Sequence, residues 1–111
     1  MATTMYFEGF SKIKYEYVLA DLKNLNALPM QGGNYLFAQR VGGRPVIVYA
    51  AETDCVRKAV VDSPRWNDAR TKHSAVFIYF HMNDAPSRRR LELHDLIRQH
   101  NPPMNPRADE A

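Results

Sequence analysis

The sequence has little of what marks a secreted, zinc-binding or membrane-spanning protein. Its one cysteine, Cys55, excludes an internal disulfide and leaves no set of thiolates to hold zinc. No apolar run approaches the roughly 20 residues that cross a bilayer, and residues 1–5 lack the basic start and apolar stretch of a signal peptide. We therefore expect a cytoplasmic protein that has no membrane partner.

A large excess of one charge is lacking as well. Fifteen Lys and Arg residues against twelve Asp and Glu residues leave a net charge of +3. That surplus is compatible with a nucleic-acid partner but is too small to demand one. Net charge alone therefore does not select a function.

What the chain does have is the composition of one folded domain, with 45% hydrophobic residues in a length of 111. Residues 13–19 alternate between apolar and polar, which predicts a strand with one buried face. Residues 35–38 and 45–49 are rich in β-formers and flank a Gly-Gly pair, which predicts a hairpin with glycine in its turn.

Helical patterns follow the hairpin. Thr53 or Asp54 suits the N-cap of a helix that ends near Asp62 and carries an apolar stripe. A second, short helix is predicted over residues 64–70, where Trp66 anchors it on the core.

The last two elements complete the predicted fold. Residues 75–80 are apolar at every position, which fits a central strand covered on both faces. The last helix is predicted to start after residues 83–86, which are cap-like and end in a proline, and to run to about His100. We expect an α/β (α+β) fold, in which helices flank a small antiparallel sheet with an extra N-terminal strand. Within this single domain, residues 1–32 form an extension, residues 33–105 the core and residues 106–111 a loose tail.

Few patterns indicate a catalytic or metal site on their own. The four histidines are not spaced to offer two ligands on one helical turn, and no nucleophile elbow or phosphate-binding glycine loop is present. The arginines at residues 88–90 point about 100° apart on a helix, so we interpret them as solvated surface.

The order of the elements and three short segments are more specific. Residues 33–35 (Gly-Asn-Tyr) and 49–51 (Tyr-Ala-Ala) occupy the two strands of the hairpin, and residues 95–105 join the last helix to an Asn-Pro-Pro-Met-Asn loop. In this order the segments resemble the two signature triplets and the C-terminal segment of the GIY-YIG nuclease superfamily. The resemblance covers residues 33–105 and is strongest to small bacterial stand-alone members.

The resemblance implies a GIY-YIG-like fold and a Mg²⁺-dependent endonuclease activity. In the family a tyrosine assists water in attacking phosphorus, an arginine stabilises the phosphate and a glutamate holds the metal ion. Tyr35 and Tyr49 stand at the two signature tyrosines and are candidate catalytic residues. Gly33 and Asn105 stand at structural positions of the motifs.

Three positions depart from the family pattern. The family arginine corresponds to Ala59, the glutamate to Leu93, and the glycine of the second triplet to Ala51. The neighbouring side chains point elsewhere, since Arg57 lies about 200° around the helix from Ala59 and Glu92 about 100° from Leu93. The arginine and the glutamate each stabilise the transition state, so we expect catalysis to be impaired or lost.

The leading hypothesis is therefore an endonuclease-like domain with impaired or lost cleavage that retains nucleic-acid binding, with DNA favoured over RNA. Arg40 and Arg44 of the hairpin could join the binding face. The candidate binding residues are Arg57, Lys58, Arg65, Arg70 and Lys72.

Two alternatives stay open. One is an active Mg²⁺-dependent endonuclease in which Glu92 is the metal ligand and Arg57 or Lys58 holds the phosphate, which requires Glu92 to share one cleft with Tyr35 and Tyr49. Without activity, no cofactor is expected.

The other alternative is a protein-interaction module that does not bind nucleic acid, which predicts an exposed apolar patch or an oligomer interface. The oligomeric state stays undetermined at this point.

Overall fold

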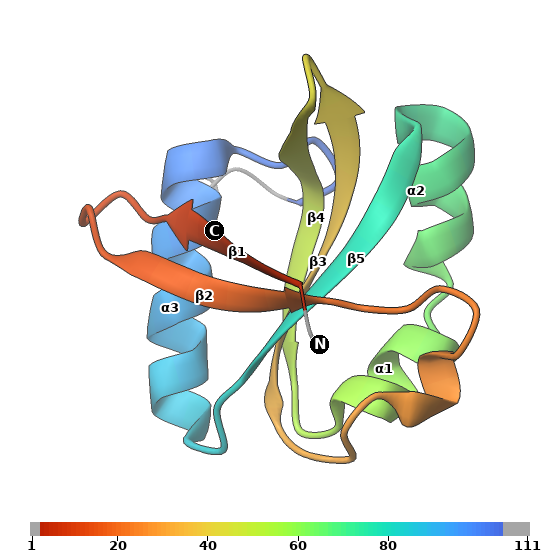
Figure 1. Ribbon diagram of the computed structural model, residues 1–111. Coiled ribbons are helices and arrows are strands. Elements are labelled where there is room, and N and C mark those ends of the chain that lie inside the picture. Colours follow the sequence, from red (N-terminus) through yellow and green to blue (C-terminus); the bar gives the residue numbers. More distant parts are fainter. Residues whose placement is uncertain (1–2, 106–111) are drawn as a thin grey trace.

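A computed structural model describes residues 3–105, which form one five-stranded antiparallel sheet with helices on both faces (Figure 1). The strand order across the sheet is β1-β2-β5-β3-β4. The predicted fold class, a small antiparallel sheet flanked by helices, is confirmed. The strands are β1 (Thr4–Glu8), β2 (Lys14–Leu19), β3 (Gly33–Val41), β4 (Arg44–Thr53) and β5 (Ala75–Met82). The helices are α1 (Val56–Val61), α2 (Arg65–His73) and α3 (Pro86–His100), and a short 3₁₀ turn, η1, covers Leu25–Ala27.

The strand β5 lies at the centre of the sheet, between β2 and β3, as its uninterrupted apolar run predicts. Successive residues of a strand point to opposite faces, and both Ile78 and its neighbour Tyr79 are buried. Leu36 and Phe37 repeat this pattern in β3. Both strands are therefore covered on both faces, which is why they lack the period-2 alternation of a half-exposed strand.

The sheet divides the core into two clusters. One lies on the side of α1 and α2 and the other on the side of α3, and these helices cover opposite faces of the sheet (Figure 1). The α1–α2 side contains, among others, Tyr35, Phe37, Val48, Val56, Val60, Ala69 and Ile78. The α3 side contains, among others, Phe7, Tyr17, Leu36, Ala38, Ile47, Tyr79 and Leu96. The sheet thus separates side chains that are adjacent in sequence.

The N-terminal region contains two strands where the sequence predicted one. The strand β1 pairs with β2 as a hairpin, and β2 pairs with β5 through Val18 and Leu19, so the hairpin extends the main sheet. The sequence of β1 shows no alternation of apolar and polar residues, because the exposed Tyr6 and the buried Phe7 are both aromatic.

Two helix predictions need correction at their ends. The N-cap position of the first helix is Cys55 and not Thr53 or Asp54, and its side chain makes no capping hydrogen bond. The strand β4 continues to Thr53, whose hydroxyl accepts a 3.1 Å hydrogen bond from the Cys55 backbone. The second helix runs over Arg65–His73, longer than predicted, and ends at Ser74 in the left-handed conformation.

The predicted Gly-Gly turn between β3 and β4 is confirmed, with φ of 58° at Gly42 and 80° at Gly43.

Among the described residues, no helix is both long and apolar enough to span a membrane. The predicted tail at residues 106–111 lies outside the described residues.

Candidate functional site

Two tyrosines of the signature segments meet on the α1–α2 side of the sheet. Tyr35 of β3 is 7% exposed, and its ring centroid lies 6.3 Å from that of the half-buried Tyr49 of β4. The guanidinium carbon of Arg65, at the start of α2, lies 5.7 Å from the centre of the Tyr49 ring. Neighbouring strands and the first turn of α2 thus bring two hydroxyls and one exposed cation together.

The environment of Tyr35 decides what its hydroxyl can do. Burial, together with the adjacent Tyr49, raises the pKa of Tyr35 to about 12, although the positive charge of Arg65 acts to lower it. A phenol with this pKa keeps its proton at neutral pH, so it is a hydrogen-bond donor and a poor general base.

Ala51, which the resemblance aligns with the glycine of the second triplet, lies in β4 directly opposite Tyr35. Its side chain packs against the core cluster of the α1–α2 side. The methyl group of Ala51 therefore lies within the sheet, beside Tyr35, and does not crowd a turn.

Glu92 lies on the other side of the sheet. Its carboxylate accepts hydrogen bonds of 3.1 and 3.4 Å from the Asn83 amide and lies 3.4 Å from His81 Nε2. The His81 ring in turn lies 5.2 Å from that of Tyr17, a member of the α3-side core. The structure therefore does not bring Glu92 into one cleft with Tyr35 and Tyr49.

The sheet also separates the two positions that the resemblance aligns with the family arginine and glutamate. Ala59 packs against the α1–α2 core and Leu93 against the α3-side core. Among residues 3–105, no three His, Cys, Asp or Glu side chains lie close enough to hold a metal ion. Neither Ala59 nor Leu93 carries an oxygen or nitrogen atom in its side chain that could bind phosphate or a metal ion.

The predicted binding residues divide into those on α2, those on α1 and those elsewhere. On α2, Arg65 stands over Tyr49, and the Arg70 guanidinium lies 6.0 Å from the centre of the Trp66 ring. Lys72, on the same helix, forms an exposed ion pair of 3.8 Å with Asp68.

The other basic residues that the sequence suggested for binding lie on α1 and in the β3–β4 hairpin. Lys58 is exposed on α1, whereas Arg57 donates a 2.7 Å hydrogen bond from Nε to the Leu28 carbonyl and so ties α1 to the preceding loop. Arg40 stands over Phe77, which packs against the α3-side core, and Arg44 lies beside the β3–β4 turn. The predicted single face therefore does not include Arg40.

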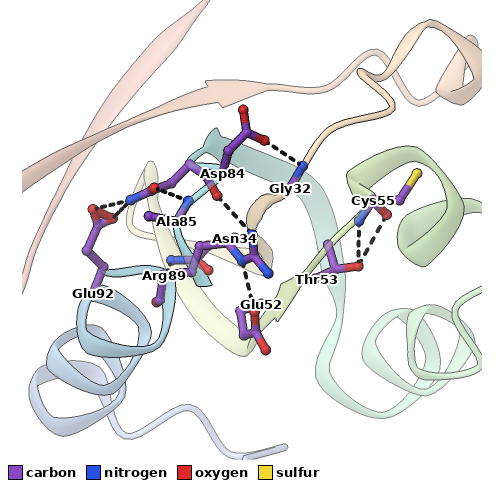
Figure 2. Close-up of polar contacts among 10 residues, drawn as sticks. Gly32, Asn34, Glu52, Thr53, Cys55, Asp84, Ala85, Arg89 and Glu92 are labelled. Atoms are coloured by element: carbon purple, nitrogen blue, oxygen red, sulfur yellow. Dashed lines mark hydrogen bonds and ion pairs between the residues drawn. The ribbon is translucent and has the colours of Figure 1, made fainter. Parts of the chain in front are cut away.

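One arginine that we interpreted as solvated surface is buried. Arg89 is 6% exposed, and its Nε donates a 2.9 Å hydrogen bond to Glu52 (Figure 2). Its Nη1 donates to the Asn83 carbonyl, and its own carbonyl accepts from the buried Asn34 amide. The cluster ties β3, β4 and α3 together. The missed signal is helical spacing, because Arg89 precedes Leu93 by four residues and so lies on the apolar stripe.

The two motif residues assigned to structure have visible contacts. A Cβ added to Gly33 would collide with the carbonyl oxygen of His81, so a glycine lets β3 approach β5 here. The Asn105 side chain exchanges two 2.8 Å hydrogen bonds with the backbone of Ala50. Together with a bond from the Met104 amide to the Val48 carbonyl, it caps the edge of β4.

No family model, curated protein or solved structure matches the chain. The resemblance to the GIY-YIG superfamily therefore rests on the residues of the signature segments and stays a prediction.

Proposed function

We propose that the chain binds nucleic acid through the surface formed by α1, α2 and Tyr49, and that it does not cleave the bound strand. The observation that carries this proposal is the position of the Arg65 guanidinium over Tyr49, next to Tyr35. The resemblance to a nuclease superfamily favours DNA over RNA as the partner.

The arginine–aromatic pairs support the binding part of the proposal. A guanidinium offers planar, forked donors that match phosphate oxygens. Arg65 on Tyr49 and Arg70 on Trp66 are both exposed and are both partly oriented by the ring beneath them. Less side-chain freedom is therefore lost when they contact a backbone phosphate.

Three features support the loss of cleavage. The raised pKa of Tyr35 disfavours it as a base. The family's phosphate-binding and metal-binding positions carry Ala59 and Leu93, neither of which has a polar side chain. Glu92, the carboxylate nearest in sequence to the second position, bonds to Asn83 on the opposite side of the sheet.

The binding test compares fluorescently labelled duplex DNA, single-stranded DNA and single-stranded RNA by anisotropy at low salt. The double variant Arg65→Gln/Arg70→Gln should lose about tenfold or more in affinity, and its salt slope should fall by about 2. The matched control Arg88→Gln/Arg90→Gln removes two exposed cations from α3 and so lowers the net charge by the same amount. Once this shared effect of net charge is taken into account, the affinity of the control should stay within about twofold of that of the native protein.

A larger loss in the α3 control than in the α2 variant would contradict the proposed surface. Cleavage of any of the three substrates with Mg²⁺, abolished by both Tyr49→Phe and Glu92→Gln, would instead favour the active endonuclease.

A further inference from the structure

A groove of about 290 Å³ lies between α3 and the turn that joins β1 to β2. It is on the α3 side of the sheet, and the helices of the proposed nucleic-acid surface cover the other side (Figure 1). Ile13 and Tyr15 form one wall, and Leu91 and Arg98 belong to the other. The groove is therefore separate from the tyrosine pair.

The groove is bordered by apolar side chains that the fold leaves open. Leu91 is 72% exposed, the highest value among the exposed large hydrophobic residues described, and Ile13 on the facing wall is 55% exposed. Phe10, in the same turn as Ile13, is also exposed. Their burial by a partner would be favourable, because each removes apolar surface from water.

Hydrogen bonds fix the two walls relative to each other. The Asp95 carboxylate on α3 accepts bonds of 2.8 Å from the Ser11 amide, 2.6 Å from the Ser11 hydroxyl and 2.7 Å from the Tyr15 hydroxyl. The Phe10 amide donates a further 3.1 Å bond to the Asp95 carbonyl. A groove held in this way is organised before a partner binds, which lowers the entropic cost of binding.

The charged side chains that the groove exposes most are arginines. Asp95 and Glu92 balance the two arginines in formal charge, but both carboxylates are half-buried and already accept hydrogen bonds from side chains of the same molecule. Arg88 and Arg98 line the groove, and none of the ion pairs among residues 3–105 involves either of them. Arg98 lies over the Phe10 ring at 4.2 Å, which holds its guanidinium beside the exposed apolar surface.

We propose that this groove docks a short acidic segment of another protein that carries at least one large apolar side chain. The apolar side chain would lie between Ile13 and Leu91, and carboxylates would pair with Arg88 and Arg98. Apolar burial supplies affinity, and the arginines select the sign of the partner's charge.

The test uses three labelled peptides, with the full chain and anisotropy as the readout. The probe alternates Glu and Leu, one control replaces Leu by Ser, and the other replaces Glu by Lys. The Glu–Leu peptide should bind about tenfold or more tightly than either control, because only it matches both the apolar walls and the arginines. The same titration, followed by amide chemical shifts, should perturb Ile13 and Leu91 most.

Variants of the exposed residues keep the test independent of folding. Leu91→Ser and the double variant Arg88→Gln/Arg98→Gln should each weaken binding of the Glu–Leu peptide about tenfold. The matched control Val61→Ser, an exposed apolar residue on α1, should leave that affinity unchanged.

Four outcomes would overturn the proposal. One is failure of the Glu–Leu peptide to bind, and another is equal binding of the Lys–Leu peptide, which would mean unselective adhesion. A third is a dimer of the native chain in sedimentation equilibrium that Leu91→Ser abolishes, because the groove would then hold a second copy. The fourth is perturbation of Ile13 and Leu91 by duplex DNA in place of the peptide.

Discussion

At the scale of single residues, burial decides which charged side chains matter to the fold. Arg89 is almost fully covered, and its guanidinium exchanges water for Glu52 and the Asn83 carbonyl. A buried cation without its partner is costly, whereas an exposed ion pair such as Lys72–Asp68 contributes little. The two ion pairs form a natural comparison within one molecule.

We expect Glu52→Gln to lower the free energy of unfolding by about 2–4 kcal/mol, because it leaves the buried Arg89 without a counter-charge while part of Glu52 remains in contact with water. The control Asp68→Asn should change it by less than about 1 kcal/mol. Urea denaturation followed by circular dichroism measures both. Equal effects of the two substitutions would show that Arg89 is solvated.

Asp95 makes stability depend on pH. Burial acts to raise the pKa of this carboxyl, but hydrogen bonds from Ser11 and Tyr15 outweigh it and lower the pKa below 3.8. A lowered folded-state pKa means that the unfolded chain binds more protons in this range, so the stabilisation is complete above about pH 5 and is lost as the pH falls through the folded-state pKa.

Asp95→Asn should therefore lower the free energy of unfolding by about 1–2 kcal/mol at neutral pH, a range that allows for screening of this partly exposed carboxylate by solvent. The loss should become progressively smaller below about pH 4. Denaturation curves at a series of pH values test this, with Asp62→Asn, an exposed carboxylate at the end of α1, as the control. A cost that is independent of pH would remove Asp95 from this role.

At the scale of elements, the C-terminal loop protects an edge of the sheet. β4 is the last strand on its side, and its exposed backbone would otherwise be open to pairing with another chain. Asn105 acts like a neighbouring strand, because its amide both donates to and accepts from Ala50. The loop that resembles a family motif thus has a structural role that needs no catalysis.

Asn105→Ala should expose the Ala50 amide and raise its hydrogen-exchange rate about tenfold or more, with a loss of about 1–2 kcal/mol in stability. The control Asn67→Ala removes an exposed side chain from α2 and should change neither quantity measurably. Unchanged protection of Ala50 in the Asn105 variant would show that the loop does not cap the strand.

The elements also differ in whether local sequence patterns predict them. The central strand, the Gly-Gly hairpin and the last helix follow from unbroken apolar residues, positive-φ glycines and an apolar stripe, which are local signals. β1 could not be predicted in this way, because Tyr6 faces solvent and the strand depends on its pairing with β2.

At the scale of the whole molecule, the sheet divides two sets of candidate residues. Sequence placed Tyr35, Tyr49 and Glu92 in one possible site, but the face of the sheet on which each lies depends on how α3 packs. No spacing along the chain reports that packing. The same division leaves the tyrosines and Arg65 on one side and the apolar groove on the other.

The most direct test of the central claim, binding without cleavage, is the affinity of the native chain for labelled duplex DNA across a salt series with Mg²⁺ present. Each sample is then denatured to measure the length of the strands. We predict that log affinity falls with log salt with a slope of about −2 or steeper, and that the strands stay intact. Affinity that does not change with salt, or strands shortened by the native protein but not by Tyr49→Phe, would contradict the account.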